Sequence, residues 1–213
     1  TDNNNIPLLR YMAKKGKPMF ISTAMTNLSE IQDSVNCVKK YIPNKFVLMQ
    51  CTGNYPSVSS DSNLKVMLTY KRLFNCLYGY SDHTLEYTNP IAATSLGASV
   101  YEKHFTLNKK MYGPDHRMSL LPSELKKTIQ IIRQTTLALG VEKKVVLKSE
   151  KYNRIKLKKS LVSTNFIKKG EKLNKNMLAI KRPGTGLLPK KIYTIGNYVA
   201  LKNIKPNSVI KLK

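Results

Sequence analysis

The sequence predicts an α/β fold, namely about half of a (β/α)₈ TIM barrel followed by a small, mostly β domain. Apolar runs alternate with amphipathic stretches up to about residue 140, which is typical of a parallel sheet whose strands are joined by helices. Four βα units fill this length, whereas a complete barrel takes roughly 250 residues. Either four preceding units lie outside this chain, or the sheet is a smaller, open one. We expect the half-barrel at residues 1–142, a charged linker at 143–157 and the small domain at 158–213.

Periodicity and end signals define each element of the first domain. Strands are expected at the apolar runs, residues 18–23, 45–51, 77–81 and 98–104. Helices are expected between and after them, at 28–41, 64–74, 90–96 and 123–139. The first of these helices has Ile31, Val35 and Val38 on one face, with Asn27 or Ser29 to cap it. The run at 45–51 is nearly all apolar, which favours a strand covered on both faces.

The small domain shows short β-like runs separated by turns. These runs lie at residues 160–163, around Ile180, at 198–201 and at 209–212. A module of 55 to 60 residues buries only about 60% of its unfolded surface and is marginally stable alone. A docking partner for this module is therefore expected.

The charge is strongly basic and unevenly distributed. The chain has 37 basic and 12 acidic residues, a net charge of +25, of which residues 143–213 supply +18. Such asymmetry points either to nucleic acid or an anionic membrane, or to a solvated basic surface. Of the basic residues, 31 are Lys and 6 are Arg, and specific phosphate or base recognition favours the Arg fork. We expect a solvated Lys surface rather than a nucleic-acid groove.

Cysteine usage and the apolar runs indicate the compartment. The 3 cysteines are odd in number and form no CxxC pair, which disfavours a disulfide framework and a structural zinc site. No apolar run approaches the roughly 18 residues of a membrane span, and residues 1–5 do not resemble a signal peptide. We expect a cytoplasmic protein without a membrane partner.

Two of the 3 histidines lie at the carboxyl ends of neighbouring predicted strands. His83 lies in GYSDHT at 79–84, and His104 lies in EKHFTL at 102–107. Active sites of α/β barrels form at the carboxyl ends of the strands, so both imidazoles are expected in one mouth, where they suit a divalent metal with open positions. Glu102 shares the strand face of His104 and is a candidate ligand-orienting group or general base. The alternative is that the two histidines are unrelated.

Further polar groups end strands or lie in tight loops. Ser22 and Ser81 end strands, where hydroxyls either help to bind phosphate or serve as caps. Tyr55, after the second strand, either reaches the mouth or covers the core. Asp115 follows Gly113 and Pro114, a combination typical of a turn. Arg182, in RPGTG, either reaches a ligand or lies in an exposed turn.

These motifs, taken in this order, resemble the C-terminal part of an N-acetylneuraminate (sialic acid) synthase. The resemblance runs along essentially the whole chain and rests on KP at 17–18, STAM at 22–25, CTGNYP at 51–56, GYSDHT at 79–84, EKHFTL at 102–107, GPDH at 113–116 and KRPGTG at 181–186. It implies a (β/α)₈ barrel joined to a small antifreeze-like (SAF) domain. The activity it implies is condensation of phosphoenolpyruvate with N-acetylmannosamine, with release of phosphate.

The resemblance also implies a role for each candidate residue. His83 and His104 would hold the divalent metal, usually Mn²⁺ with Mg²⁺ or Co²⁺ as alternatives, which polarises the aldehyde of the open-chain sugar. C3 of phosphoenolpyruvate would attack that carbon, and Glu102 would lie near the water that adds at C2 before phosphate leaves. The implied substrate-binding residues are Ser22 and Ser81 for phosphate, Tyr55 and Asp115 for the sugar, and Arg182, which would bind the N-acetyl group across a domain-swapped homodimer.

Two matters stay open at the level of sequence. Legionaminate, pseudaminate and spore-coat synthases share these motifs, so the sugar is not defined. The first four βα units would supply further phosphate-binding and sugar-binding groups, and we therefore expect the 213-residue chain to be inactive alone. The alternative function is that of an inactive, truncated homologue whose basic small domain binds a polyanionic glycan or nucleic acid.

Overall fold

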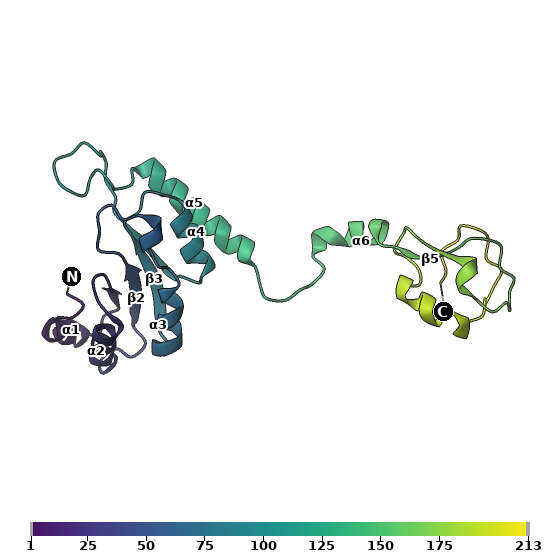
Figure 1. Ribbon diagram of the computed structural model, residues 1–213, viewed down its shortest axis with the longest axis horizontal. Helices are drawn as coiled ribbons and strands as arrows, with labels where there is room; N and C mark the ends of the chain where they lie inside the picture. The colour runs from purple at the N-terminus through teal and green to yellow at the C-terminus, as the bar shows by residue number, and fades with distance from the viewer. Residues whose placement is uncertain (1, 212–213) are drawn as a thin grey trace. The chain divides into compact units, whose positions relative to one another are not determined.

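The computed structural model describes residues 2–211 as two compact units, divided between Val141 and Glu142 (Figure 1). The first unit is built on a four-stranded parallel sheet in the order β1-β2-β3-β4. Its strands are β1 (Met19–Ser22), β2 (Phe46–Cys51), β3 (Leu77–Asp82) and β4 (Val100–Lys103). The predicted parallel α/β arrangement is confirmed, because each strand pairs in parallel with the next one along the chain.

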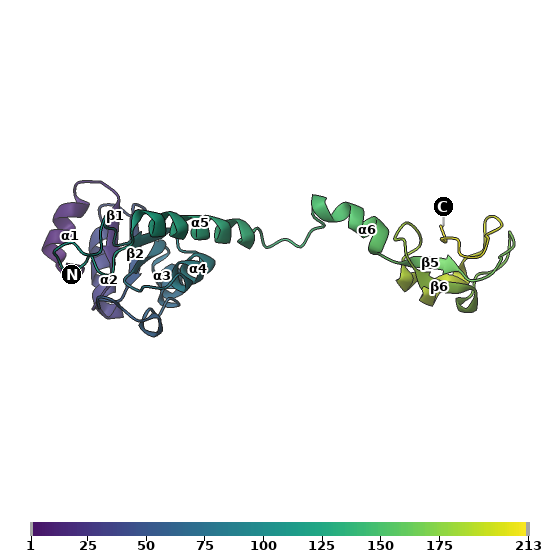
Figure 2. The ribbon, with the colours of Figure 1, turned by 90° about the horizontal axis from the view of Figure 1, so that it is seen from above.

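Helices connect these strands as predicted, with small shifts of their ends. They are α2 (Leu28–Lys39), α3 (Val66–Phe74), α4 (Thr88–Ser95) and α5 (Pro122–Leu139), with a 3₁₀ turn η1 (Ser59–Asp61) before α3. A further helix, α1 (Ile6–Ala13), was not predicted, although Asn5 accepts a hydrogen bond from the Leu8 amide and Pro7 lies in the first turn. Figures 1 and 2 show α1 beside α2 and α4 beside α5.

The two faces of the sheet differ because side chains alternate along each strand. One face packs against the helices through Met19, Ile21, Leu48 and Tyr80, all of them buried. On the other face Phe20 is 60% exposed. This second face is the one that would line the interior of a closed barrel, and it carries the polar residues described below.

The second unit is a small module with its own core. Strands β5 (Ser160–Ser163) and β6 (Leu178–Lys181) pair antiparallel, and 3₁₀ segments η3 (Lys175–Met177) and η4 (Pro189–Asn197) complete the module. The buried apolar side chains are Leu161, Ile167, Leu173, Leu178, Ile195, Ala200 and Ile210. The predicted β-like runs at 198–201 and 209–212 form only single bridges, at Val199 and Val209; residue 212 lies outside the described residues.

The expected linker at 143–157 contains helical structure. Its second half forms a 3₁₀ turn, η2 (Lys148–Glu150), followed by α6 (Lys151–Leu157). The Ile155 carbonyl accepts a hydrogen bond from the Gly184 amide at 2.8 Å, so α6 is tied to the module that follows. The expected charged linker thus contains a short helix in its second half.

Within residues 2–211, no helix combines the length and the apolar character that crossing a bilayer requires. Cys37, Cys51 and Cys76 are all free thiols.

Candidate active site

The imidazole rings of His83 and His104 lie next to each other at the carboxyl end of the sheet. Each histidine follows its strand by one residue, His83 after β3 and His104 after β4. Their ring centroids are 5.2 Å apart, with the planes inclined by 62°. His83 is 5% exposed and His104 is half-buried. The structure thus brings together the two residues that the sequence analysis paired.

A backbone carbonyl selects the tautomer of His83. Its Nδ1 lies 2.8 Å from the carbonyl oxygen of Thr52. Because a carbonyl only accepts hydrogen bonds, Nδ1 must carry the proton, and in the neutral ring the lone pair then lies on Nε2. This is the arrangement that second-sphere contacts impose on metal-binding histidines.

Tyr55 lies against both imidazoles. Its ring centroid is 4.0 Å from that of His83, inclined by 33°, and 5.7 Å from that of His104, nearly edge-on at 84°. Partial burial raises the pKa of the Tyr55 phenol, and the nearby charges of Cys51, Asp115 and Glu102 raise it further. Since the side chain is still 53% exposed, Tyr55 presents a protonated hydroxyl group beside the histidines rather than covering the core.

Two carboxylates flank the imidazole pair. Glu102 lies on β4 and accepts a hydrogen bond of 2.6 Å from the Ser81 hydroxyl of β3. Asp115 comes from the loop before α5, and its Oδ2 lies 3.9 Å from Nδ1 of His104. The structure therefore places Ser81, Glu102 and Asp115 in the same neighbourhood as the histidines.

Cys51 also belongs to the candidate active site, although its sequence suggested only disulfide or zinc chemistry, both of which were disfavoured. Cys51 ends β2, is 7% exposed, and its Sγ lies 3.8 Å from Nδ1 of His83. Burial opposes ionisation of this thiol, but the polar side chains of His83, Ser22 and Ser81 around it outweigh this effect and lower the pKa of Cys51. The contact with Ser22 links that predicted residue to the site. The signal available in the sequence was the position of Cys51 at a strand end.

The donor atoms at the site suit a divalent metal. Imidazole nitrogens from His83 and His104, with carboxylate oxygens from Glu102 and Asp115 nearby, are donors that Mn²⁺ and similar ions accept. Within residues 2–211, however, no three His, Cys, Asp or Glu side chains converge as a ready-made metal cluster.

Arg182 lies in the second unit, directly after β6, with its side chain exposed. The loop that holds it is fixed by one buried hydroxyl group. Ser160 Oγ donates to the Pro183 carbonyl at 2.7 Å and accepts from the Gly186 amide at 2.9 Å. This loop is thus built into the module, with Arg182 at its surface.

Comparison with known proteins identifies both units. The NeuB family matches residues 1–144, and the SAF domain matches residues 158–213. The chain is 41% identical to the N,N'-diacetyllegionaminic acid synthase of Campylobacter jejuni over 209 residues, covering 97% of this chain and 63% of that protein. It is 36% identical to the N-acetylneuraminate-9-phosphate synthase of Mus musculus over 211 residues, covering 98% of this chain and 58% of that protein.

A solved structure agrees with these matches. The spore coat polysaccharide biosynthesis protein spsE of Bacillus subtilis superposes with a TM-score of 0.62 at 31% identity, over 98% of this chain and 64% of that one. The chain spans between 55% and 63% of the length of the curated relatives it matches. The parallel sheet and its connecting helices are thus a TIM-type half-barrel, the small β module is a SAF domain, and the chain belongs to the NeuB family.

Proposed function

We propose that the complete protein condenses phosphoenolpyruvate with N-acetylmannosamine, or a related N-acetylated sugar, to give a nonulosonic acid and phosphate. One observation carries this proposal: His83, Glu102 and His104 meet on one sheet face at the carboxyl ends of adjacent strands. Relatives of the chain are named as legionaminic, N-acetylneuraminate-9-phosphate and pseudaminic acid synthases, which supports the substrate class.

The metal belongs to this proposal. His83 and His104 would hold a divalent ion, Mn²⁺ first and Mg²⁺ or Co²⁺ as alternatives, and the bound ion supplies Lewis-acid polarisation of the sugar aldehyde. The Thr52 carbonyl supports this assignment because it keeps the Nε2 lone pair of His83 available.

The other side chains of the site are assigned to proton transfer and to binding of the two substrates. A carbon–carbon bond forms between C3 of phosphoenolpyruvate and the aldehyde carbon, whose oxygen takes up a proton. Water then adds at C2, and the bond from C2 to the phosphate oxygen breaks. We assign acceptance of the water's proton to Glu102, which Ser81 orients through its 2.6 Å hydrogen bond. Ser22 and Ser81 are assigned to the phosphate, and Tyr55 and Asp115 to the sugar.

Arg182 is assigned to the N-acetyl group of the sugar in a partner's site. An exposed guanidinium on a loop fixed by Ser160 is suited to reach a ligand outside its own module. The proposal therefore includes a domain-swapped homodimer in the cytoplasm. The three free thiols agree with a reducing compartment.

The 213-residue chain alone is proposed to be inactive. Its sheet has four strands in the described residues, and Glu102 is exposed on a face that a closed barrel would cover. Water that reaches this face competes with the protein groups for a charged substrate. Measurable condensation by the purified 213-residue chain would contradict this part of the proposal.

The test is phosphate release by the complete protein with phosphoenolpyruvate, MnCl₂ and a panel of N-acetylated sugars. We expect phosphate release with at least one sugar, and loss of it in H83A and H104A. The matched control is Q32A, an exposed position on α2, which should keep full activity. No phosphate release with any sugar and any of the three metals would reject the proposed function, and steeply salt-dependent polyanion binding would then favour the alternative.

A further inference from the structure

A buried ion pair lies directly behind the two histidines. Lys103 Nζ is 3.2 Å from Asp82 Oδ2, and their side chains are only 4% and 0% exposed. Asp82 is the last residue of β3 and Lys103 is the last residue of β4. Each therefore immediately precedes one of the histidines, on the face of the sheet opposite to theirs.

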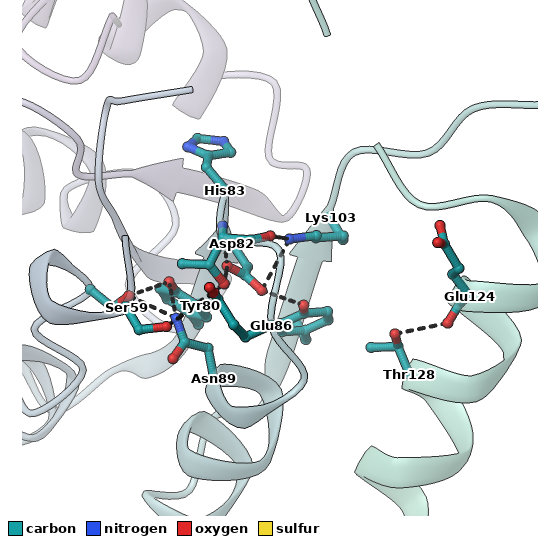
Figure 3. Close-up of polar contacts among 12 residues, drawn as sticks. Ser59, Tyr80, Asp82, His83, Glu86, Asn89, Lys103, Glu124 and Thr128 are labelled. Atoms are coloured by element: carbon teal, nitrogen blue, oxygen red, sulfur yellow. Dashed lines mark hydrogen bonds and ion pairs between the residues drawn. The ribbon is translucent and has the colours of Figure 1, made fainter. Parts of the chain in front are cut away.

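Every oxygen of the Asp82 carboxylate has a hydrogen-bond partner. Oδ1 accepts from the Thr84 amide at 2.8 Å and the Thr84 hydroxyl at 2.7 Å, and Oδ2 accepts from the Tyr101 hydroxyl at 2.6 Å. Lys103 Nζ also donates to the Thr84 carbonyl. The pair thus joins β3, the turn after it and β4, as Figure 3 shows. Such full pairing is what makes a buried charge tolerable.

The pair coincides with the register of the two strands. Asp82 and Lys103 are register partners, so the next pair along the strands is His83 and His104. A slip of one residue between parallel strands would turn one imidazole to the opposite face of the sheet. In Figure 3 the His83 side chain points away from the Asp82–Lys103 contact, as this alternation requires.

We propose that Asp82 and Lys103 are positioning residues, whose ion pair holds β3 and β4 in the register that sets His83 opposite His104. The apolar contacts of the sheet resist separation of the strands, but they are not directional, whereas a charge pair bound at fixed atoms defines one register. This inference rests on the proposed function, in which the paired imidazoles of His83 and His104 would hold the metal. The sequence signal was the charged residue before each histidine.

The test compares the unaltered chain with D82N/K103M and K103R. The double variant removes both charges and leaves neither unpaired, so it is the form most able to fold. K103R keeps the charge pair and serves as the rescue. The control is K109M, which removes a more exposed lysine–carboxylate pair outside the β3–β4 register, between Lys109 in the loop before α5 and Glu124 on α5, at 2.8 Å.

The direct readout is the nuclear Overhauser effect (NOE) between ring protons of His83 and His104 in the histidine-labelled chain, which has only 3 histidines. We expect this cross-peak in the unaltered chain, K103R and K109M, and its loss in D82N/K103M. The contact of His116 with Thr106, 2.7 Å between ring and hydroxyl, should persist in all four. The second readout is a Co²⁺ titration followed by visible absorption, in which D82N/K103M should bind about 10- to 100-fold more weakly than K109M.

A full-strength cross-peak in the folded double variant would overturn the proposal, as would equal Co²⁺ affinity of D82N/K103M and K109M. K103Q is the milder second variant: it should weaken the cross-peak, and failure of both variants to fold would indicate a purely structural role and overturn the positioning role. If the NOE results hold while the complete protein releases no phosphate, the proposed function fails and the register role stands.

Discussion

The Ser81 hydroxyl donates to Glu102 Oε1 at 2.6 Å, across the register pair that these residues form between β3 and β4. Ser81 is 3% exposed, whereas Glu102 is exposed. A hydroxyl bound to a carboxylate at this distance is a charge-assisted hydrogen bond, stronger than a neutral one. The only carboxylate that β4 contributes to the candidate site is thus held in one orientation by the neighbouring strand.

This relationship predicts a difference between two variants of the complete protein. E102Q removes the assigned proton acceptor and should lower kcat by about 10²- to 10⁴-fold. S81A leaves the carboxylate in place but unoriented, so kcat should fall less than in E102Q, and loss of the assigned phosphate contact should also raise the KM for phosphoenolpyruvate. Steady-state phosphate release measures both. Wild-type kcat in E102Q would refute the role of Glu102.

Alkaline pH should destabilise the first unit through Tyr80. Burial raises the pKa of this fully buried phenol to about 12, from an ordinary value of 10.0, and the nearby Asp82 charge adds to the effect while hydrogen bonds with Ser62 and Asn89 oppose it. The folded state holds the proton more tightly, so its stability is complete below pH 10 and is lost as the pH rises from 10 through about 12. The loss amounts to about 3 kcal/mol.

The check is urea unfolding between pH 8 and 12, followed by circular dichroism because the chain has no Trp. Y80F is the control, and its stability should fall less over this range. The comparison is needed because Lys103 changes the stability in the opposite direction over this pH range. Burial lowers the pKa of Lys103, with Asp82 opposing, so deprotonation of this lysine at high pH favours the folded state. Identical alkaline profiles for Y80F and the unaltered chain would contradict the prediction.

A methyl group at residue 186 should destabilise the second unit. A Cβ added to Gly186 would collide with Val209 Cγ1, and would lie 2.6 Å from the Ile210 carbonyl oxygen and 3.2 Å from Ser160 Cβ. Overpacking of this kind costs about 1 to 3 kcal/mol or more. G186A should therefore unfold at lower urea concentration and loosen the loop that carries Arg182.

Gly196 supplies the matched control for that variant. A Cβ there would meet nothing within 4 Å, so G196A should leave the stability of the second unit unchanged. Hydrogen exchange of amides in β5 and β6 (Ser160–Ser163 and Leu178–Lys181) isolates this unit from the first. Equal exchange protection in the two variants would rule out the packing explanation.

The N-terminus of α2 depends on a reciprocal pair of hydrogen bonds. The Asn27 side chain accepts from the Glu30 amide at 3.1 Å, and the Glu30 carboxylate accepts from the Asn27 amide at 2.8 Å. N27A should lower the free energy of unfolding by about 1 kcal/mol, whereas N27D keeps a capping oxygen and should cost much less. Urea unfolding measures both, and equal losses would mean that the side-chain cap contributes nothing.

Local signals in the sequence were sufficient for most elements of the first unit. The buried run of β2 (Phe46–Cys51) and the spacing of Ile31, Val35 and Val38 in α2 depend only on chain periodicity and burial, and both are found as predicted. The helical part of the expected linker could not be predicted in this way. Its stabilising contact, from Ile155 to Gly184, joins residues far apart in the chain.

The sequence by itself determined the alternation of strands and helices and the family motifs, because both depend on neighbouring residues. It predicted that His83 and His104 lie at the ends of adjacent strands, and the structure brings their rings together. Only the tertiary structure decided that Cys51 contacts His83, that Tyr55 packs on both imidazoles, and that Asp82 and Lys103 meet behind them. These contacts cross between strands, and strand register arises from the packing and pairing of the whole sheet rather than from any local stretch of chain.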